Sequence, residues 1–159
     1  MATIVESVRA QLASEWIPSL YREKVRTQRT RSFHLNIPAK ENDPEILHTL
    51  LGIELKVGNR RFSCPELPTA RYLRIFARIG CADFAVPYDI SKISFIADQL
   101  DTAWHRMILV LEKELKGLQA SAAGRARSAL MREIRGEIDQ IGAGAAMPAF
   151  DRETKQRKK

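Results

Sequence analysis

Between residues 32 and 87 the chain switches repeatedly between two apolar patterns, and this alternation constrains its fold more than any other feature. Apolar residues at every second position predict short strands, and the strands are expected over residues 32–37, 53–57, 61–64 and 81–86. A Gly-Asn pair at 58–59 predicts a tight hairpin between the second and third of these strands.

Two short helices are expected between the strands. Asp43 and Pro44 suit the N-cap and the first position of a helix that Gly52 would end. A second helix is expected over Pro68–Ile79, with Gly80 as its stop. The resulting order, β-α-β-β-α-β, is that of the ferredoxin-like arrangement. We therefore expect an α+β fold with a four-stranded mixed sheet; a smaller mixed sheet with other connections is the main alternative, because every element is short.

An amphipathic helix is expected before this block. Thr3 and Glu6 have the spacing of a capping box, and apolar residues recur at three and four through the first twenty positions. Pro18 removes one backbone donor, so a kink or break is expected near Trp16–Ile17. The following segment, Arg22–Arg31, carries five basic residues and one acid and fits either a basic helical extension or a loop.

From Tyr88 onward the pattern is helical, with Asp89 or Ser91 as the N-cap. Heptad-like apolar spacing continues to Leu118, and Gly124 is expected to break the helix before a further helical run. The domain organisation that follows is an α+β domain over 1–118 with its core at about 32–87, a helical appendage over 119–141, and a disordered basic tail over 142–159.

Composition narrows the class of protein. The formal charge is +7 and the isoelectric point about 9.7, which suits an acidic partner such as nucleic acid or an acidic protein surface. Two cysteines, Cys64 and Cys81, are fewer than a small secreted domain usually carries. No signal peptide is recognisable, and the longest strictly apolar run is only Met107–Leu111. We therefore expect a cytoplasmic protein without integral membrane association.

Five arginines form the most specific charge feature, and they are Arg60, Arg61, Arg71, Arg74 and Arg78. The last three lie at i, i+3 and i+7, so they share one face of the predicted helix. Residues 55–82 contain six basic residues and one acid. Because guanidinium groups match phosphate oxygens, this surface is our candidate for binding nucleic acid or a ribonucleoprotein. A solvated face whose arginines pair with carboxylates elsewhere is the competing interpretation.

Known nucleic-acid and enzyme motifs do not extend this hypothesis. Phe33 and Phe62 stand where an RNA-recognition motif would place stacking aromatics, but neither run matches the aromatic-rich signature. The spacing from Cys64 to Arg71 is one residue longer than a phosphatase loop, and two prolines remove donors that such a loop needs. Histidines and cysteines are scattered, so we expect no metal, no cofactor and no catalytic residues.

The C-terminal helical run is the second functional candidate. Its apolar residues form one face, and they are Leu130, Ile134, Ile138 and Ile141. We interpret this face as a protein interface, which would allow a homodimer through the C-terminal helix. The leading hypothesis is a non-enzymatic binding protein that contacts nucleic acid through its arginines. The alternative is a protein–protein adaptor or assembly factor that acts through these helices.

Overall fold

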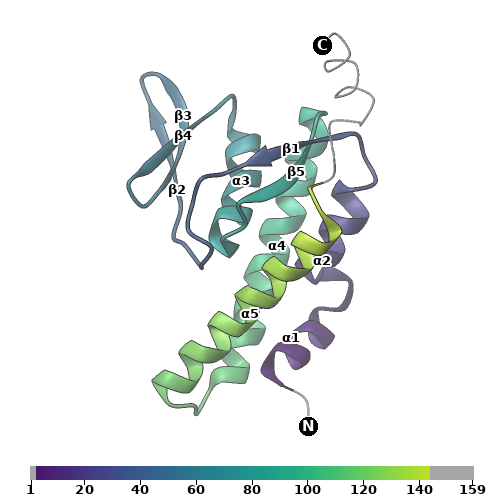
Figure 1. Cartoon of the computed structure of the whole chain (residues 1–159), viewed down its shortest axis with the longest axis vertical. Coiled ribbons are helices and arrows are strands. Elements are labelled where there is room, and N and C mark those ends of the chain that lie inside the picture. The colour runs from purple at the N-terminus through teal and green to yellow at the C-terminus, as the bar shows by residue number, and fades with distance from the viewer. Residues whose placement is uncertain (1–2, 144–159) are drawn as a thin grey trace, which may run out of the picture.

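The computed structural model describes residues 3–143, and in it the chain is an α+β protein with two small antiparallel sheets (Figure 1). One sheet pairs β1 (Thr30–His34) with β5 (Asp83–Pro87). The other is a meander of β2 (Glu45–Thr49), β3 (Gly52–Val57) and β4 (Arg60–Cys64). The meander extends to one side of the molecule, while the two-stranded sheet lies closer to the helices (Figure 1).

The other helical segments pack around the two longest helices, α4 (Ile90–Leu115) and α5 (Ala120–Ile141). These segments are α1 (Ile4–Leu12), η1 (Ala13–Glu15), α2 (Ile17–Leu20), η2 (Tyr21–Val25) and α3 (Leu67–Ile79). Figure 1 shows α3 between the sheets and α4, and α5 running along α4 on the side of the N-terminal helices. One continuous group of buried side chains links all of these layers.

The helix expected from Asp43 to Gly52 is wrong, because this segment forms β2 and the turn that follows it. Its apolar spacing fits a helix, but a helix of this length is marginal by itself. Pairing of Ile46 with Leu55 on β3 decides the outcome, and it leaves Leu50 and Leu51 in the turn. Without this helix the ferredoxin-like order does not form, and the strands divide into two sheets.

Several local expectations are confirmed. The capping box of Thr3 and Glu6 starts α1, and the chain breaks at Trp16, which is extended and acts as the N-cap of α2. The helix α3 ends at Gly80, whose φ is +92°. A Cβ atom at this glycine would lie 2.3 Å from the carbonyl oxygen of Lys40, so both conformation and close approach require glycine here.

The two long helices meet at a different point from the one expected. Asp89 caps α4, as its sequence context predicts, and accepts a hydrogen bond from the Ser91 amide. The break assigned to Gly124 is wrong, because this residue lies inside α5 with open space around it. The turn between α4 and α5 instead contains Gly117, whose φ of +87° L-residues rarely adopt.

Residues 144–159, most of the predicted basic tail, lie outside the described part of the chain. Within residues 3–143, no helix is both long enough and apolar enough to cross a membrane.

Candidate functional site

The three arginines of α3 share one face, and this face lies against α4 rather than towards bulk solvent. Arg71, Arg74 and Arg78 are only 25%, 24% and 21% exposed. Their neighbours on α4 are Asp98 and Asp101, whose side chains are 64% and 17% exposed. The carboxylates that the competing interpretation required are therefore supplied by the next helix.

Asp101 is the centre of this ion-pair network. Arg71 Nη2 lies 2.5 Å from Asp98 Oδ1 and 3.1 Å from Asp101 Oδ2. Arg74 Nη2 lies 3.7 Å from Asp101 Oδ2, and Arg78 Nη1 lies 3.8 Å from Asp101 Oδ1. Two carboxylates thus face three guanidinium groups, which leaves a formal excess of one positive charge at the α3–α4 contact.

The pKa values of Arg71 and Arg78 shift in opposite directions. The hydrogen bond to Asp98 raises the pKa of Arg71. Burial, followed by the charge of Arg74, lowers the pKa of Arg78, whose guanidinium carbon lies 5.6 Å from the centre of the Trp104 ring. These contacts are typical of a structural link between helices, because the charged groups are directed at each other and at an aromatic ring.

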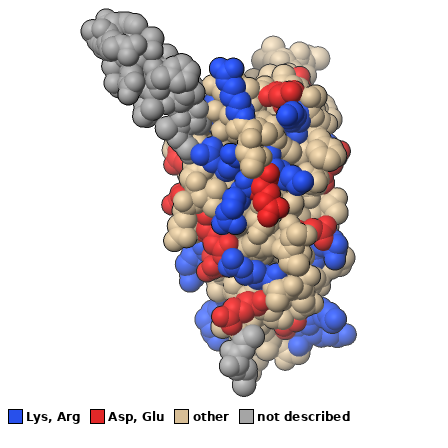
Figure 2. Space-filling model, turned by 90° about the vertical axis from the view of Figure 1, so that its right-hand side faces the viewer, with Lys and Arg blue, Asp and Glu red and all other residues tan. Residues whose placement is uncertain are grey.

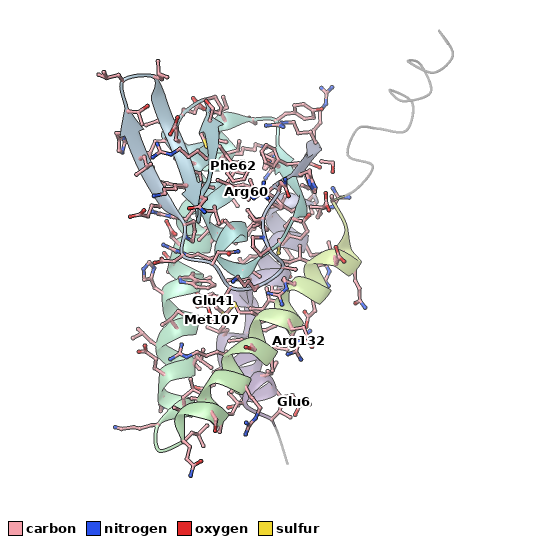
Figure 3. All side chains as sticks on the ribbon, turned by 60° about the vertical axis from the view of Figure 1, so that its left-hand side comes forward. Glu6, Glu41, Arg60, Phe62, Met107 and Arg132 are labelled. Atoms are coloured by element: carbon pink, nitrogen blue, oxygen red, sulfur yellow. The ribbon has the colours of Figure 1, made fainter. Side chains whose placement is uncertain are left out.

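Arg60 and Arg61 lie on β4 at the turn of the meander, where both are exposed. Figure 3 labels Arg60 beside Phe62 on the meander, well away from Arg132 on α5. Arg61 donates to Glu54 Oε1 at 3.1 Å, whereas Arg60 has no ion pair among the described residues. Within that same part of the chain, no ion pair joins these two arginines to Asp98 or Asp101.

The C-terminal helix packs into the body of the protein. Leu130 and Ile134 are 0% exposed and Ile138 is 1% exposed, while Ile141 is half-buried. The Trp16 indole nitrogen donates to Glu137 Oε1 at 2.8 Å, which connects the N-terminal helices to α5. The predicted interface residues therefore fill the chain's own core, and the three fully buried ones have no surface to offer to a partner.

Five cations occupy η2, β1 and the turn between them, and we call them the basic segment: Arg22, Lys24, Arg26, Arg29 and Arg31. None of them forms an ion pair with a described carboxylate. Figure 2 shows one face of the molecule, on which Lys and Arg side chains are spread from top to bottom with Asp and Glu side chains between them. The basic segment therefore carries five cations that no described carboxylate neutralises through an ion pair.

Aromatic rings lie under two cations of the basic segment. The guanidinium carbon of Arg29 lies 5.1 Å from the centre of the Tyr88 ring, and that of Arg31 lies 5.4 Å from the Phe33 ring. The pairing of β1 with β5 positions the first contact, because the Tyr88 amide donates to the Arg29 carbonyl oxygen at 3.1 Å. Tyr88 is 42% exposed, so a flat aromatic surface accompanies the charge.

Tyr21, the first residue of η2, holds this region to the body. Its hydroxyl accepts a hydrogen bond from the Ala85 amide at 2.8 Å and donates to the Gly142 carbonyl oxygen at 2.8 Å. Tyr72 donates to the Ala85 carbonyl oxygen at 2.6 Å. Two tyrosine hydroxyls thereby satisfy backbone groups of β5 that no strand pairs. Burial raises the pKa of Tyr21 to about 12 and that of Tyr72 well above its ordinary value.

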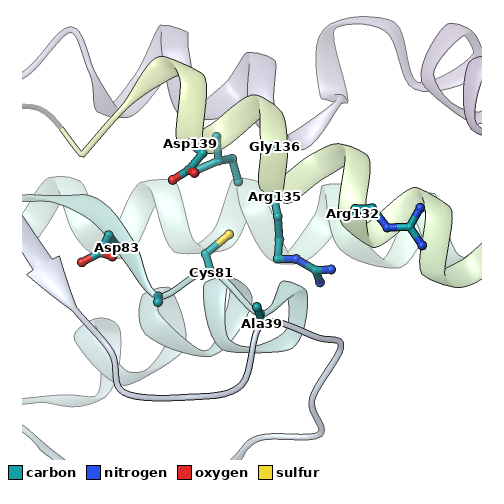
Figure 4. Close-up of a pocket in the computed structure, with 10 residues that line it drawn as sticks. Ala39, Cys81, Asp83, Arg132, Arg135, Gly136 and Asp139 are labelled. Atoms are coloured by element: carbon teal, nitrogen blue, oxygen red, sulfur yellow. The ribbon is translucent and has the colours of Figure 1, made fainter.

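A hollow of about 360 Å³ lies between α5 and the start of β5 (Figure 4). Cys81 points into it from below α5, between Asp139 and Arg135 (Figure 4). Burial raises the pKa of the Cys81 thiol to about 12, so the thiol is neutral near pH 7 and a poor nucleophile. Arg135 is engaged elsewhere, since its Nη1 donates to the Ile79 carbonyl oxygen at 2.8 Å. The hollow therefore has no activated nucleophile.

Within residues 3–143, no group of three or more His, Cys, Asp or Glu side chains is arranged to hold a metal ion. Cys64 is buried, and its pKa is also raised by burial. His34 is engaged with Asp83, 2.9 Å away on the partner strand of β1.

Tyr88 is the residue that sequence reasoning missed. Its position after a strand and before a helix cap makes it look like a loop residue. Only the antiparallel register of β1 and β5 brings it to Arg29.

Comparisons with known proteins add no assignment, because no family model, no curated protein and no solved structure matches this chain.

Proposed function

We propose that this chain is a non-enzymatic, cytoplasmic nucleic-acid-binding protein whose contact surface is the basic segment together with Tyr88. The observation that supports this proposal is the Arg29 guanidinium over the exposed Tyr88 ring, within a run of cations that no described carboxylate pairs. Both cysteines are free and buried, which fits a reducing compartment.

The two components of this surface suit the two components of a nucleic acid. Unpaired Lys and Arg side chains attract phosphates and release counterions on binding. An aromatic ring beside a guanidinium group provides a plane on which an unpaired base stacks. Lys24 and Arg29 are exposed, and the Tyr88 ring lies beside Arg29. The arrangement therefore favours a single strand over a duplex, whose bases are already stacked.

The surface proposed here differs from the one expected from the α3 arginines. Arg71, Arg74 and Arg78 are directed at Asp98 and Asp101, so a phosphate would have to compete with these carboxylates. Arg60 keeps its place as an outlying contact, since it is exposed and has no ion pair among the described residues.

The test is fluorescence anisotropy with labelled single-stranded and double-stranded oligonucleotides over a series of salt concentrations. The double variant Lys24→Glu, Arg29→Glu should weaken single-strand binding by about tenfold or more and flatten its salt dependence, because phosphate contacts are lost. The matched control is Lys113→Glu, Lys116→Glu at the α4–α5 turn, where both side chains are exposed and the change in charge is the same.

Tyr88→Ala and Tyr88→Phe separate stacking from charge. The alanine variant should lose the preference for single strands, and the phenylalanine variant should retain it, because the ring is what stacks. Equal loss of affinity in the basic-segment variant and in the Lys113, Lys116 control would show that only the net charge matters. That result, or binding that does not depend on salt, would refute the proposed surface.

A further inference from the structure

The meander of β2, β3 and β4 has two outer edges, and they differ in how well they are protected. The β4 edge carries Arg60 and Arg61 and is followed by Pro65. Charged side chains and proline are the usual means by which proteins keep an edge strand from pairing with another chain. The β2 edge has neither arginine nor lysine. Its one charged residue, Glu45, and the buried Pro44 before it are confined to the start of the strand, so Ile46–Thr49 has no charged side chain and no proline.

The backbone of β2 has unused hydrogen-bonding groups. Thr49 and Gly52 close the turn as directly opposed residues. In an antiparallel hairpin the bonded pairs alternate from that point, so the amide and carbonyl groups of Ile46 and His48 face away from β3. Neither residue forms a backbone hydrogen bond on this outer side with any other described residue. The edge therefore presents a template for one more strand.

Apolar side chains surround this template. Leu50 and Leu51 at the β2–β3 turn are 106% and 94% exposed, which is unusual for neighbouring leucines. Ile46 and Leu47 on β2 itself are only half-buried. Another strand placed along β2 would cover part of this apolar surface as well as satisfy the backbone groups.

The sequence of β2 is compatible with a second copy of itself. In an antiparallel pair centred on Leu47, Ile46 lies opposite His48 of the second copy, and Leu47 lies opposite its own counterpart. Glu45 then faces Thr49, so no like charges are directly opposed. Such a pair has twofold symmetry and closes, because the other edge of each meander is protected by Arg60 and Arg61.

We infer that this protein forms a homodimer by antiparallel pairing of β2 with β2 of a second copy, which joins the two meanders into one continuous sheet. The contact is separate from the basic segment, which lies on η2 and β1. It is also separate from α5, whose apolar residues fill the core of the chain.

Leu47→Lys tests this inference. The change places two lysines opposite each other on the twofold axis, so dimerisation measured by sedimentation equilibrium should weaken by about tenfold or more. Leu47 is on the face of the meander opposite Leu55, away from the core, so the monomer should retain its helical circular dichroism. Ser63→Lys on the exposed, opposite edge is the matched control and should leave dimerisation unchanged.

A mixture of the Leu47→Lys and Leu47→Glu variants should recover dimers, because opposite charges then meet at the axis. Single cysteines check the register: oxidised Leu47→Cys should form a disulfide-linked dimer. Thr49→Cys should not, because the two Thr49 positions would be about 13 Å apart along the strands, at about 3.3 Å per residue. A wild-type protein that stays monomeric, a Leu47→Lys variant that dimerises normally, or equal cross-linking at both positions would overturn the inference.

Discussion

The arginines of α3 and the cations of the basic segment lie in opposite surroundings. Arg71, Arg74 and Arg78 are held between two helices, at most one quarter exposed, with Asp98 and Asp101 opposite them. Lys24 and Arg29 lie at the surface, and no described carboxylate forms an ion pair with either. Positive charge in the first group holds helices together, whereas charge in the second group is available to a ligand.

The physical reason for this difference is the direction of the neighbouring helix. The parallel course of α3 and α4 brings Arg71 to Asp98 and Arg78 to Trp104. Within residues 3–143, no carboxylate forms an ion pair with the cations of η2 and β1. Clusters of basic residues should therefore be interpreted only after the element that packs on them is known.

The largest expected effect is a loss of stability when the ion pairs of the α3 arginines are removed. Among the described residues, Asp101 is the one carboxylate within 4 Å of all three α3 arginines, so Asp101→Asn leaves three largely buried guanidinium groups with less compensating charge. We expect a loss of about 2–3 kcal/mol in the free energy of unfolding, measured by urea denaturation. Asp98→Asn is the control; since Asp98 is 64% exposed, its change should stay within about 0.5 kcal/mol. Equal effects of the two changes would contradict the central position of Asp101.

The next largest effect is on stability at alkaline pH, and it comes from Tyr21, which holds the basic segment to the body of the protein. The pKa of Tyr21 is raised from 10.0 to about 12 in the fold, so the neutral phenol is favoured there. Its contribution to stability is complete below pH 10.0 and is lost as the pH rises towards 12. Tyr21→Phe should reduce this alkaline loss, although Tyr72 contributes in the same direction.

Urea denaturation at several alkaline pH values would measure this effect, with the absorbance of tyrosinate as a second signal. Tyr88→Phe is the control, because the Tyr88 ring is partly exposed. A slope that Tyr21→Phe does not change would show that the Tyr21 hydroxyl is not what couples η2, β5 and the end of α5.

The smallest effect is expected from single substitutions that compare the two groups directly. Lys24→Gln should change the free energy of unfolding by less than about 0.5 kcal/mol, because its side chain is exposed and forms no ion pair with a described carboxylate. Arg74→Gln should cost more, since it removes a half-buried partner of Asp101. Nucleic-acid affinity should show the reverse order. A basic-segment substitution that destabilises the protein more than Arg74→Gln would contradict the comparison.

Local signals were sufficient wherever the chain's nearest neighbours decide its conformation. The Thr3–Glu6 capping box, the break at Trp16, the turn at Gly58 and the end of α3 at Gly80 all follow from a few adjacent residues. Caps, prolines and glycines act on the backbone within one turn, so their effects do not depend on the rest of the fold.

Segments whose partner is distant could not be assigned in this way. The apolar residues at 46, 47, 50 and 51 have helical spacing, and only pairing with β3 makes residues 45–49 a strand. The apolar face of α5 is equally ambiguous, because an interface and a core have the same pattern in sequence. In the fold, α5 is held against the body of the protein by two hydrogen bonds. The Trp16 indole donates to Glu137, and Arg135 donates to the Ile79 carbonyl oxygen.

The sequence by itself determined the α+β class, the basic charge, and the places where most helices start and stop. Only the tertiary structure decided which basic side chains are paired with carboxylates and which are open to a ligand. Asp101 lies 27 or more residues from Arg71 and Arg74 in the sequence, and the packing of α3 on α4 brings them together. It also created the pairing of Arg29 with Tyr88 across β1 and β5. Such contacts depend on register and packing between distant segments, which the spacing of residues along one segment does not encode.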